Sequence, residues 1–492
     1  MNALLGKFLG EVEREEAALL SWGLVDGSLA EQELRDKAES FLGLSNTWND
    51  FPDGYAIIEE MVARGLLFRR EDAGSYRYRS RMAEAVRLLA RLRQLFPKHL
   101  RQPGGWIASP TLVADFRFLV RARRYPARDQ QPAEWISHWV ASDAQLTPLQ
   151  EAVVRALLGA ESEDVGFPLA GFQVRAMTRI LNLGSSAAAK GTMISAGTGS
   201  GKTLAFYVPA LALLTGMIER DAVHWTRVLA LYPRNELLKD QFTETVRQAR
   251  RIKAVLKRKG TRPIRTGAYF GATPNDSGEV VENSWGGPWP ARSGGRICPF
   301  LTCPEIQCSG VMLWRDEDRM SDVERLVCEQ CGEVVEADEI VLTRRRMTKA
   351  PPDILFTTTE MMNQRLTDAS NWHLFGVGLA ASRKPVLLLL DEAHTYGGAH
   401  GAQVAYLLRR WRHRSQATPH FVGLSATLME AGSFFAQLIG LPPNSVEEIS
   451  PEAGELIDEG VEYMLALRGE IRCRALASFP PRSRRLCCSA GC

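Results

Sequence analysis

The sequence lacks the features of several protein classes. No run of about 18 apolar residues occurs, so no membrane-spanning helix is expected. The start, MNALLGKFLGEVEREE, turns acidic too early for a secretory signal. The formal net charge is only +3, so a surface for a polyanion must be a local patch. We therefore expect a cytoplasmic protein with no membrane partner, in which clustered cysteines more often bind metal than form disulfides.

The chain length of 492 residues suggests about three domains. Residues 1–150 are rich in helix formers and predict a mainly helical accessory region. Within it, residues 55–82 are typical of a helix, a strand, a turn at Asp72–Gly74 and a second strand. That order fits either a winged-helix unit or a helical domain with one hairpin.

Residues 160–450 show a different pattern, in which short apolar runs alternate with helical stretches. This alternation predicts an α/β fold with a parallel sheet covered by helices on both faces. Ligands of such sheets bind outside the carboxyl ends of the strands. The runs are GTMIS (191–195), RVLALY (227–232), DILFTTT (353–359), PVLLLL (385–390) and HFVGLS (420–425).

A glycine-rich segment follows the first of these runs and precedes a helical stretch. Glycines let the backbone wrap around phosphates, and the following helix start favours negative charge. In this segment Lys202 would reach the β- and γ-phosphates of a nucleotide, and the Thr203 hydroxyl would hold Mg²⁺. The strict pattern has glycine where Ala196 stands. The other candidate phosphate-binding residues are Gly197, Thr198, Gly199, Ser200 and Gly201.

Two acidic residues follow the buried run PVLLLL, within the sequence DEAH. Buried carboxylates are costly unless they serve a metal or a reaction. Asp391 suits Mg²⁺, and Glu392 suits the role of general base for an attacking water. His394 could couple the nucleotide site to neighbouring loops. The sequence therefore predicts Lys202, Asp391 and Glu392 as catalytic residues.

AGTGSGKT, DEAH and Ser425-Ala426-Thr427 occur in the order of motifs I, II and III of superfamily 2 DEAD/DEAH-box (DExH) helicases, which this sequence resembles. Two further segments resemble motifs Ia and Ib, where the family holds one nucleic-acid strand; they contain Arg234 and Thr358. Gly171-Phe172-Gln173 resembles the adenine-reading glutamine motif, and a glutamine amide can pair with adenine. DEAHTYGGAHGAQVAYLLRRW resembles YprA/MrfA-like helicases and DpdJ-type helicases of bacterial defence or DNA-modification clusters.

This resemblance implies a first RecA-like domain that uses ATP and Mg²⁺ as cofactors and binds nucleic acid, with DNA favoured over RNA. It implies that Ser425 and Thr427 couple ATP hydrolysis to strand separation. It also implies partners among other proteins of a bacterial defence or DNA-modification system. A non-catalytic nucleotide- and nucleic-acid-binding module is the alternative interpretation, although a retained Glu392 favours an enzyme.

A cysteine-rich insertion, residues 295–340, separates the segments that resemble motifs Ia and Ib. Its spacing is close to that of a zinc ribbon, which predicts a structural Zn²⁺; buried free thiols are the alternative. Cys298 offers a competing first pair with Cys303, so one cysteine is surplus. The predicted metal ligands are Cys303, Cys308, Cys328 and Cys331.

Three arginine-rich stretches could neutralise phosphates, or could be solvated faces: 250–265, 344–346 and 409–412. Too few residues follow Thr427 for a second α/β domain of about 100 residues or more. Residues 470–492, IRCRALASFPPRSRRLCCSAGC with its preceding glutamate, lack apolar periodicity. We expect a frameshift or truncation there, with the second RecA-like domain absent; a genuine metal-binding or disordered tail is the alternative.

Overall fold

The computed structural model forms two compact units, one of residues up to Arg124 together with those from Asp458 on, and one of residues Tyr125–Ile457. The 470–492 tail lies outside the described residues, as do Thr198 and Thr427. The structure describes residues 3–45, 51–72, 74–95, 101, 103–141, 146–160, 166–184, 186–197, 199–282, 289–426 and 428–469.

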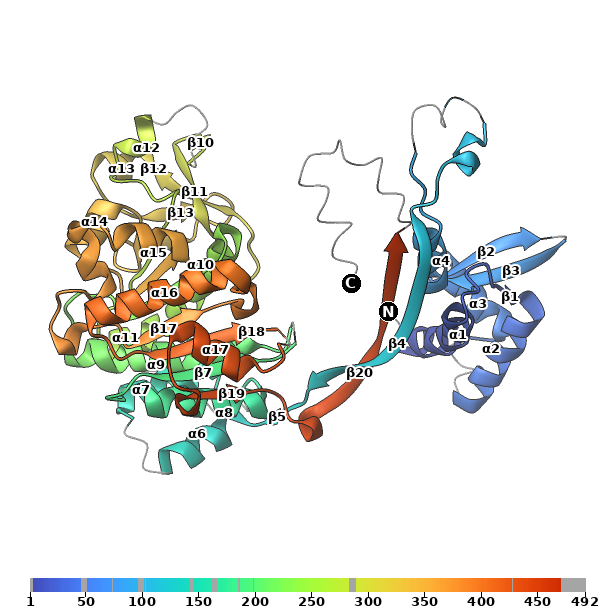
Figure 1. Ribbon diagram of the computed structural model, residues 1–492, viewed down its shortest axis with the longest axis horizontal. Coiled ribbons are helices and arrows are strands. Elements are labelled where there is room, and N and C mark those ends of the chain that lie inside the picture. The colour runs from blue at the N-terminus through green and yellow to red at the C-terminus, as the bar shows by residue number, and fades with distance from the viewer. Residues whose placement is uncertain are drawn as a thin grey trace. The chain divides into compact units, whose positions relative to one another are not determined.

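The first unit contains a small three-stranded sheet with the strand order β1-β3-β2, packed against helices (Figure 1). Its elements follow in the order helix, strand, two helices and two strands. A winged-helix unit here stays a prediction. Asp53 and Ser80 begin α3 and α4 by accepting hydrogen bonds from backbone N–H groups. The elements are α1 (Ala3–Ser21), β1 (Leu29–Ala30), α2 (Glu31–Ser45), α3 (Gly54–Ala63), β2 (Leu67–Asp72), β3 (Ser75–Ser80) and α4 (Arg81–Ala90).

The helix, strand and strand predicted within residues 55–82 are present as α3, β2 and β3. The description of residues 1–150 as mainly helical misses β4 (Val113–Pro126), which pairs with β20 (Leu456–Gly469). Most side chains of β4 are exposed, so it has no buried apolar run to mark it. Its partner is more than 300 residues away in the sequence, and local patterns carry no signal of that pairing.

An eight-stranded sheet with the order β15-β9-β16-β8-β17-β18-β7-β19 forms the centre of the second unit. Every adjacent pair in it is parallel. Buried apolar clusters lie on both faces, as the sequence predicted. The strands are β7 (Lys190–Ser195), β8 (Val228–Tyr232), β9 (Thr266–Tyr269), β15 (Ile340–Val341), β16 (Ile354–Thr358), β17 (Leu387–Leu390), β18 (His420–Ser425) and β19 (Val446–Ile449).

Two sets of helices cover this sheet (Figure 1). Helix α9 is long and apolar enough to cross a membrane by length and composition, but 72% of its apolar window is buried within the protein. Its burial identifies it as a core helix. The helices are α6 (Pro132–Ala141), α7 (Pro148–Leu158), α8 (Gly171–Leu183), α9 (Lys202–Arg220), α10 (Asn235–Arg251), α11 (Lys253–Arg258), α14 (Arg344–Lys349), α15 (Thr359–Arg365), α16 (Gly398–Ser415) and α17 (Ala431–Ile439).

The compact unit begins at Tyr125, earlier than the predicted boundary of 160. Helix α6 and the start of α7 fall within the predicted accessory region, yet Trp135 and Leu149 belong to the main core. An amphipathic helix has the same apolar spacing whichever partner it packs against. The boundary therefore could not be placed from the sequence pattern.

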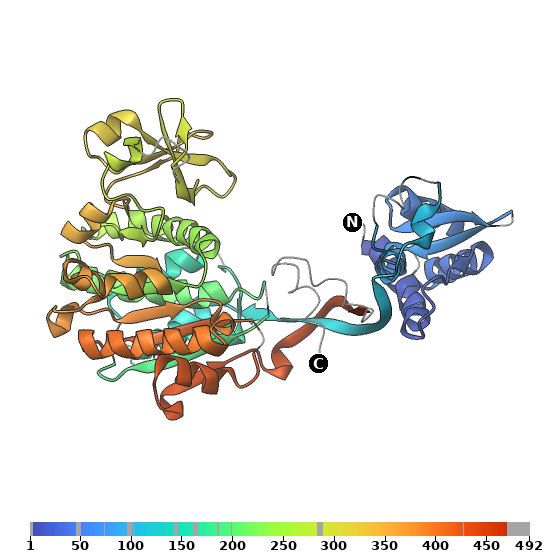
Figure 2. The ribbon, with the colours of Figure 1, turned by 45° about the horizontal axis from the view of Figure 1, so that its top comes forward.

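The cysteine-rich insertion forms a separate antiparallel sheet with the order β10-β11-β12-β13-β14. Figure 2 shows it in yellow beyond α10 and α14. Phe300 of the insertion packs edge-on against Phe242 of α10, with ring centroids 5.5 Å apart. Arg250, part of the basic stretch 250–265, binds Glu333 of the insertion. The strands are β10 (Ala291–Arg292), β11 (Gly295–Thr302), β12 (Val311–Arg315), β13 (Leu326–Cys328) and β14 (Val334–Val335).

Asp353 joins the amino ends of several parallel strands and is fully buried. Its carboxylate accepts hydrogen bonds from the Arg227 guanidinium at 2.5 Å and from Arg262 at 2.7 and 2.8 Å. It also accepts the backbone N–H of Arg265 at 2.9 Å. Because the Arg227 side chain is fully buried as well, its charge has no access to water.

We predict that Asp353→Asn destabilises the protein by about 3–5 kcal/mol, because it leaves the buried Arg227 charge uncompensated. Arg383→Ala is the control, since Arg383 forms an exposed ion pair with Asp221 and should cost about 1 kcal/mol or less. Urea unfolding at neutral pH measures both. Equal, small effects of the two substitutions would contradict a structural role for Asp353.

Candidate nucleotide and metal sites

The phosphate loop connects β7 to α9. Side chains of the loop and of the start of α9 hold it in shape by donating to its backbone carbonyls. The Lys202 ammonium donates to the Ala196 carbonyl at 2.6 Å, and the Ser200 hydroxyl donates to the Gly197 carbonyl at 2.7 Å. Gly201 adopts a positive φ of 83°, and a Cβ there would lie 2.5 Å from the Gln173 amide nitrogen. Glycine is therefore required at position 201. Thr203 lies in the first turn of α9, beside Lys202.

The DEAH residues follow β17, which lies two strands from β7 in the same sheet. Parallel register aligns Leu390 with Gly423 of β18, and Gly423 with Met193 of β7. Asp391 therefore leaves the sheet at the edge where the phosphate loop begins. The structure thus brings Lys202, Asp391 and Glu392 to one strand edge.

The charged groups at this edge influence one another. Burial raises the pKa of Asp391 from 3.8 to about 6; the neighbouring Glu392 carboxylate adds to the rise, whereas the Glu392 backbone N–H and Lys202 oppose it. Burial lowers the pKa of Lys202, and the carboxylates of Glu392 and Asp391 work against that shift. A divalent cation would offset the cost of ionising Asp391, as expected of a Mg²⁺ ligand.

Glu392 adopts a left-handed backbone conformation with φ +49° and ψ +45°, which is uncommon for a residue other than glycine. Its carboxylate lies 3.2 Å from Nδ1 of His394. The same Nδ1 lies 3.2 Å from the Ser425 hydroxyl at the end of β18. His394 therefore links the acidic strand end to the segment predicted to be motif III.

Gln173 is buried and bound to the backbone at both ends of its amide. Its oxygen accepts the N–H of Ala170, which begins α8, and its nitrogen donates to the Gly201 carbonyl at 2.9 Å. The side chain therefore ties α8 to the phosphate loop. A bidentate contact with adenine remains a prediction, and it would require the amide oxygen to exchange its present donor.

Two residues beside Gln173 were not found from the sequence. Phe167 is an exposed aromatic residue, and the Arg128 guanidinium lies 5.7 Å from its ring centroid. Arg128 also reaches the neighbourhood of Gly201. An exposed ring joined to the phosphate loop through Arg128 could stack on a nucleobase. Phe167 belongs to no motif that spacing would identify, so only the fold shows its position.

Of the residues predicted to face a nucleic-acid strand, Arg234 follows β8 and Thr358 ends β16, and these two strands are adjacent in the sheet. Arg234 is exposed and begins α10. Thr358 begins α15, and its hydroxyl accepts the backbone N–H of Met361 at 3.2 Å. The structure therefore places both residues at the carboxyl edge, while the Thr358 oxygen already serves its own helix.

The predicted zinc ligands meet in the insertion. Their four Sγ atoms all lie within 4.8 Å of one another. The Sγ distances are 3.5 Å between Cys303 and Cys331 and 3.7 Å between Cys308 and Cys328. Tetrahedral Zn²⁺ with sulfur at about 2.3 Å requires sulfur atoms roughly 3.8 Å apart, so the four thiols fit this ion.

The backbone around the thiols also fits a metal site. A Cβ at Gly310 would lie 2.6 Å from the Cys328 Sγ and 3.2 Å from the Cys308 Sγ, so only glycine leaves room there. Gly332 turns the chain after Cys331 with a φ of +75°. Cys298, the competing ligand, is buried outside the cluster, and burial raises its thiol pKa to about 12.

A phosphate loop, an acidic strand end and a parallel sheet covered on both faces define a P-loop nucleotide-binding domain. The family model of the DEAD/DEAH box helicases matches residues 170–268 and 317–433. The second unit therefore contains a domain that matches the DEAD/DEAH-box helicase family model. The gap between the matched segments, residues 269–316, includes the first half of the cysteine-rich insertion.

Among curated relatives, the chain is 28% identical to Druantia protein DruE of Escherichia coli (strain UMEA 4076-1) over 299 residues, which cover 51% of this chain and 16% of DruE. It is 33% identical to ATP-dependent helicase hrq1 of Schizosaccharomyces pombe over 94 residues, covering 18% and 8%. The chain thus spans only a small part of these relatives.

Two solved structures resemble this chain at low overall similarity. The helicase MrfA bound to DNA has a TM-score of 0.38 and 18% identity, covering 72% of this chain and 32% of MrfA. The Mycobacterium smegmatis helicase Lhr, bound to single-stranded DNA and AMP-PNP, has a TM-score of 0.37 and 20% identity, covering 63% and 28%.

We predict that Asp391→Asn stabilises the nucleotide-free protein at pH 7 by on the order of 2–3 kcal/mol while weakening Mg²⁺-dependent nucleotide binding. The folded-state pKa of about 6 exceeds the unfolded value near 3.9, so ionising Asp391 removes stability as pH rises from about 4 to 6. The gain from asparagine should therefore vanish below about pH 4.

Urea unfolding at several pH values, together with nucleotide titrations with and without Mg²⁺, measures the two effects. Glu219→Gln removes an exposed carboxylate from α9 and should change neither. A destabilising Asp391→Asn substitution at pH 7 would contradict the electrostatic account.

Proposed function

We propose that this chain is the ATP-binding half of an ATP-dependent nucleic-acid helicase or translocase of superfamily 2. The observation that carries the proposal is the meeting of Lys202, Asp391 and Glu392 at one edge of the sheet. The charges of these three residues influence one another, although they come from segments far apart in the chain. Motors of this type convert phosphoryl transfer into movement along a strand.

In the proposed reaction, the backbone of residues Gly197–Gly201, with Thr198 inferred from the sequence, binds phosphate oxygens, and Lys202 neutralises charge on the β- and γ-phosphates. Thr203 and Asp391 would hold the Mg²⁺ that, when bound, offsets charge on the phosphates. Glu392 would orient the attacking water and accept its proton.

His394 is proposed to pass the state of the nucleotide site to the neighbouring strand. It contacts both Glu392 and Ser425, each at 3.2 Å. Any movement of Glu392 during hydrolysis would change its contact with His394. That change would in turn alter the contact between His394 and Ser425, at the start of the Ser425–Thr427 segment. The left-handed backbone of Glu392 supports the proposal, because strained conformations persist where function requires them.

For the second ligand, we propose a nucleic-acid strand along the carboxyl edge, next to Arg234 and Thr358. Arg234 is exposed and can neutralise a phosphate. DNA is favoured over RNA by the resemblance of the DEAH segment to YprA/MrfA-like and DpdJ-type helicases. The same resemblance supports a cytoplasmic role with other proteins of a bacterial defence or DNA-modification system.

The chain spans 16% of DruE, which supports a role for it as one part of a larger motor. We therefore propose that the chain in isolation binds ATP and nucleic acid but hydrolyses ATP slowly and unwinds poorly. The competing proposal is a non-catalytic binding module that works through partners. The placement of Glu392 beside Asp391 and Lys202 favours the enzyme.

We also propose that the four-cysteine cluster holds a structural Zn²⁺. The four thiols converge from two hairpins of the insertion, and Gly310 leaves room for their sulfur atoms. The insertion contacts α10, which follows the proposed strand-binding residue Arg234. A metal that orders the insertion would therefore also brace the helix beneath it.

We predict that Lys202→Ala abolishes nucleotide binding, whereas Glu392→Gln preserves it and lowers hydrolysis by about 10²–10⁴-fold. Lysine supplies the charge that holds the phosphates, while glutamine keeps the shape of the base but cannot accept a proton. Fluorescent-nucleotide binding and phosphate release, with and without single-stranded DNA, measure both. Nucleic-acid-stimulated hydrolysis by the wild-type chain that survives Glu392→Gln would exclude this residue as the base.

For the metal site, we predict that Cys328→Ala removes bound zinc, because a three-thiolate site binds the ion more weakly than four thiolates do. Cys298→Ala is the matched control: it removes a buried thiol from the same insertion, outside the cluster, and should leave the zinc content unchanged. Elemental analysis of purified protein gives the metal-to-protein ratio. A wild-type protein without zinc would rule out the proposed site.

A further inference from the structure

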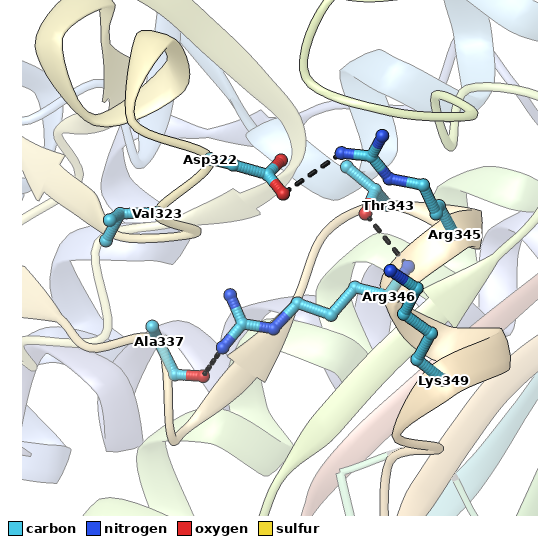
Figure 3. Close-up of a pocket in the computed structure, with 7 residues that line it drawn as sticks. All are labelled: Asp322, Val323, Ala337, Thr343, Arg345, Arg346 and Lys349. Carbon is cyan, nitrogen blue, oxygen red and sulfur yellow. Dashed lines mark hydrogen bonds and ion pairs between the residues drawn. The ribbon is translucent and has the colours of Figure 1, made fainter.

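A pocket of about 430 Å³ lies between the cysteine-rich insertion and α14. Asp322, Val323 and Ala337 line it from the insertion side. Thr343, which begins α14, and three cationic residues of α14 line it from the other side (Figure 3). These cations are Arg345, Arg346 and Lys349. The pocket is therefore walled partly by the segment that the proposed metal orders.

Positive charge predominates among the residues that line the pocket. Arg345 is paired with Asp322, the single carboxylate of the lining, at 3.0 Å. Arg346 donates to the Ala337 carbonyl at 3.3 Å, which holds its guanidinium across the pocket. The Lys349 side chain is exposed, and its ammonium has no hydrogen bond or ion pair among the described residues. Figure 3 shows the Arg345 guanidinium directed toward Asp322 and the Arg346 guanidinium directed toward Ala337, with Lys349 beside the base of Arg346.

One buried acid lies behind this wall. The Glu324 carboxylate is 4.0 Å from the Arg346 Nε. It accepts the backbone N–H of Leu342 at 2.6 Å and that of Thr343 at 3.1 Å, and it also bonds the Thr343 hydroxyl. Because these three donors already bind Glu324, its carboxylate holds the start of α14 in place. It does not form an ion pair with the Lys349 ammonium.

The start of α14, which follows the carboxyl end of β15, lies near the carboxyl edge of the large sheet. The Arg344 N–H donates to the Pro274 carbonyl at 3.0 Å, just beyond the end of β9. The Arg344 guanidinium lies 5.5 Å from the Tyr269 ring centroid. Arg365, at the end of the helix that Thr358 begins, lies 5.5 Å from the same ring. Thus α14 is a neighbour of the proposed strand-binding segment.

We propose that this pocket binds a backbone phosphate of the nucleic-acid strand beyond its contacts at Arg234 and Thr358, a role that rests on the function proposed above. Guanidinium groups match phosphate oxygens in geometry, and an unpaired ammonium adds a compact charge. The lining contains no aromatic residue on which a base could stack. The pocket would therefore bind the phosphate backbone of the strand whatever the base sequence of that strand.

The experiment compares two double substitutions that remove equal charge. Arg345→Ala with Lys349→Ala empties the pocket of two cations, and both side chains are exposed. Lys257→Ala with Lys259→Ala removes two exposed lysines that precede β9, at the opposite edge of the sheet. Binding of a labelled oligothymidylate is measured by anisotropy across a series of salt concentrations.

Loss of one phosphate contact should lower affinity about tenfold at low salt and make the slope of log K against log salt shallower by about 0.7. The control pair should leave the slope unchanged. A third variant, Asp322→Asn, should tighten binding several-fold, because it releases Arg345 and removes the carboxylate of the lining. Asp322 has a φ of +53°, a conformation that asparagine also tolerates, so this substitution preserves the backbone.

Wild-type affinity and slope in the Arg345→Ala, Lys349→Ala variant would overturn the inference while leaving nucleic-acid binding by the domain intact. Competition by inorganic phosphate for the pocket, with DNA binding unaffected by the variant, would identify a free-anion site and also overturn it. Absence of any salt-dependent binding by the wild-type chain would remove both this inference and the proposed strand-binding function.

Discussion

Parallel pairing of β7, β18, β17 and β8 is the constraint on which the rest of this structure depends. Gly423 opposes Met193 on one side and Leu390 on the other, so these strands end level with one another. A Cβ at Gly423 would collide with Met193 and with Phe435, which shows how closely the central strands are covered. Because these strands end level, the phosphate loop, the acidic residues and Ser425 lie close together, although they are far apart in the sequence.

The two edges of the sheet serve different purposes. At the amino edge, Asp353 is fully buried and satisfied by Arg227, Arg262 and the backbone of Arg265, which fixes the strand starts. At the carboxyl edge, Asp391 is buried with an elevated pKa, and Glu392 has a strained backbone. The amino edge thus holds buried ion pairs that stabilise the fold. The carboxyl edge holds a buried carboxylate whose ionisation is unfavourable, and a bound nucleotide and metal would offset that cost.

The cysteine-rich insertion is attached to the side of this sheet domain. It folds around four thiols, contacts α10 through Phe300, and forms one wall of the basic pocket beside α14. Part of the basic stretch 250–265 attaches the insertion and strand starts to the domain, since Arg250 binds Glu333 and Arg262 binds Asp353. Arg250 and Arg262 therefore have internal partners, whereas the Lys349 ammonium has no hydrogen bond or ion pair among the described residues.

The sequence by itself determined the class of fold, the positions of five central strands and the residues that meet at the proposed nucleotide site. It could do so because buried parallel strands are continuous apolar runs and because phosphate and magnesium chemistry demands particular residues at fixed spacing. It also identified four thiols at zinc-ribbon spacing. Only the tertiary structure decided that Cys298 stays apart from them, that β4 pairs with β20, and that Phe167 contacts Arg128, which reaches the phosphate loop. These outcomes depend on contacts between segments distant in the chain, and local pattern carries no record of which distant partner a segment meets.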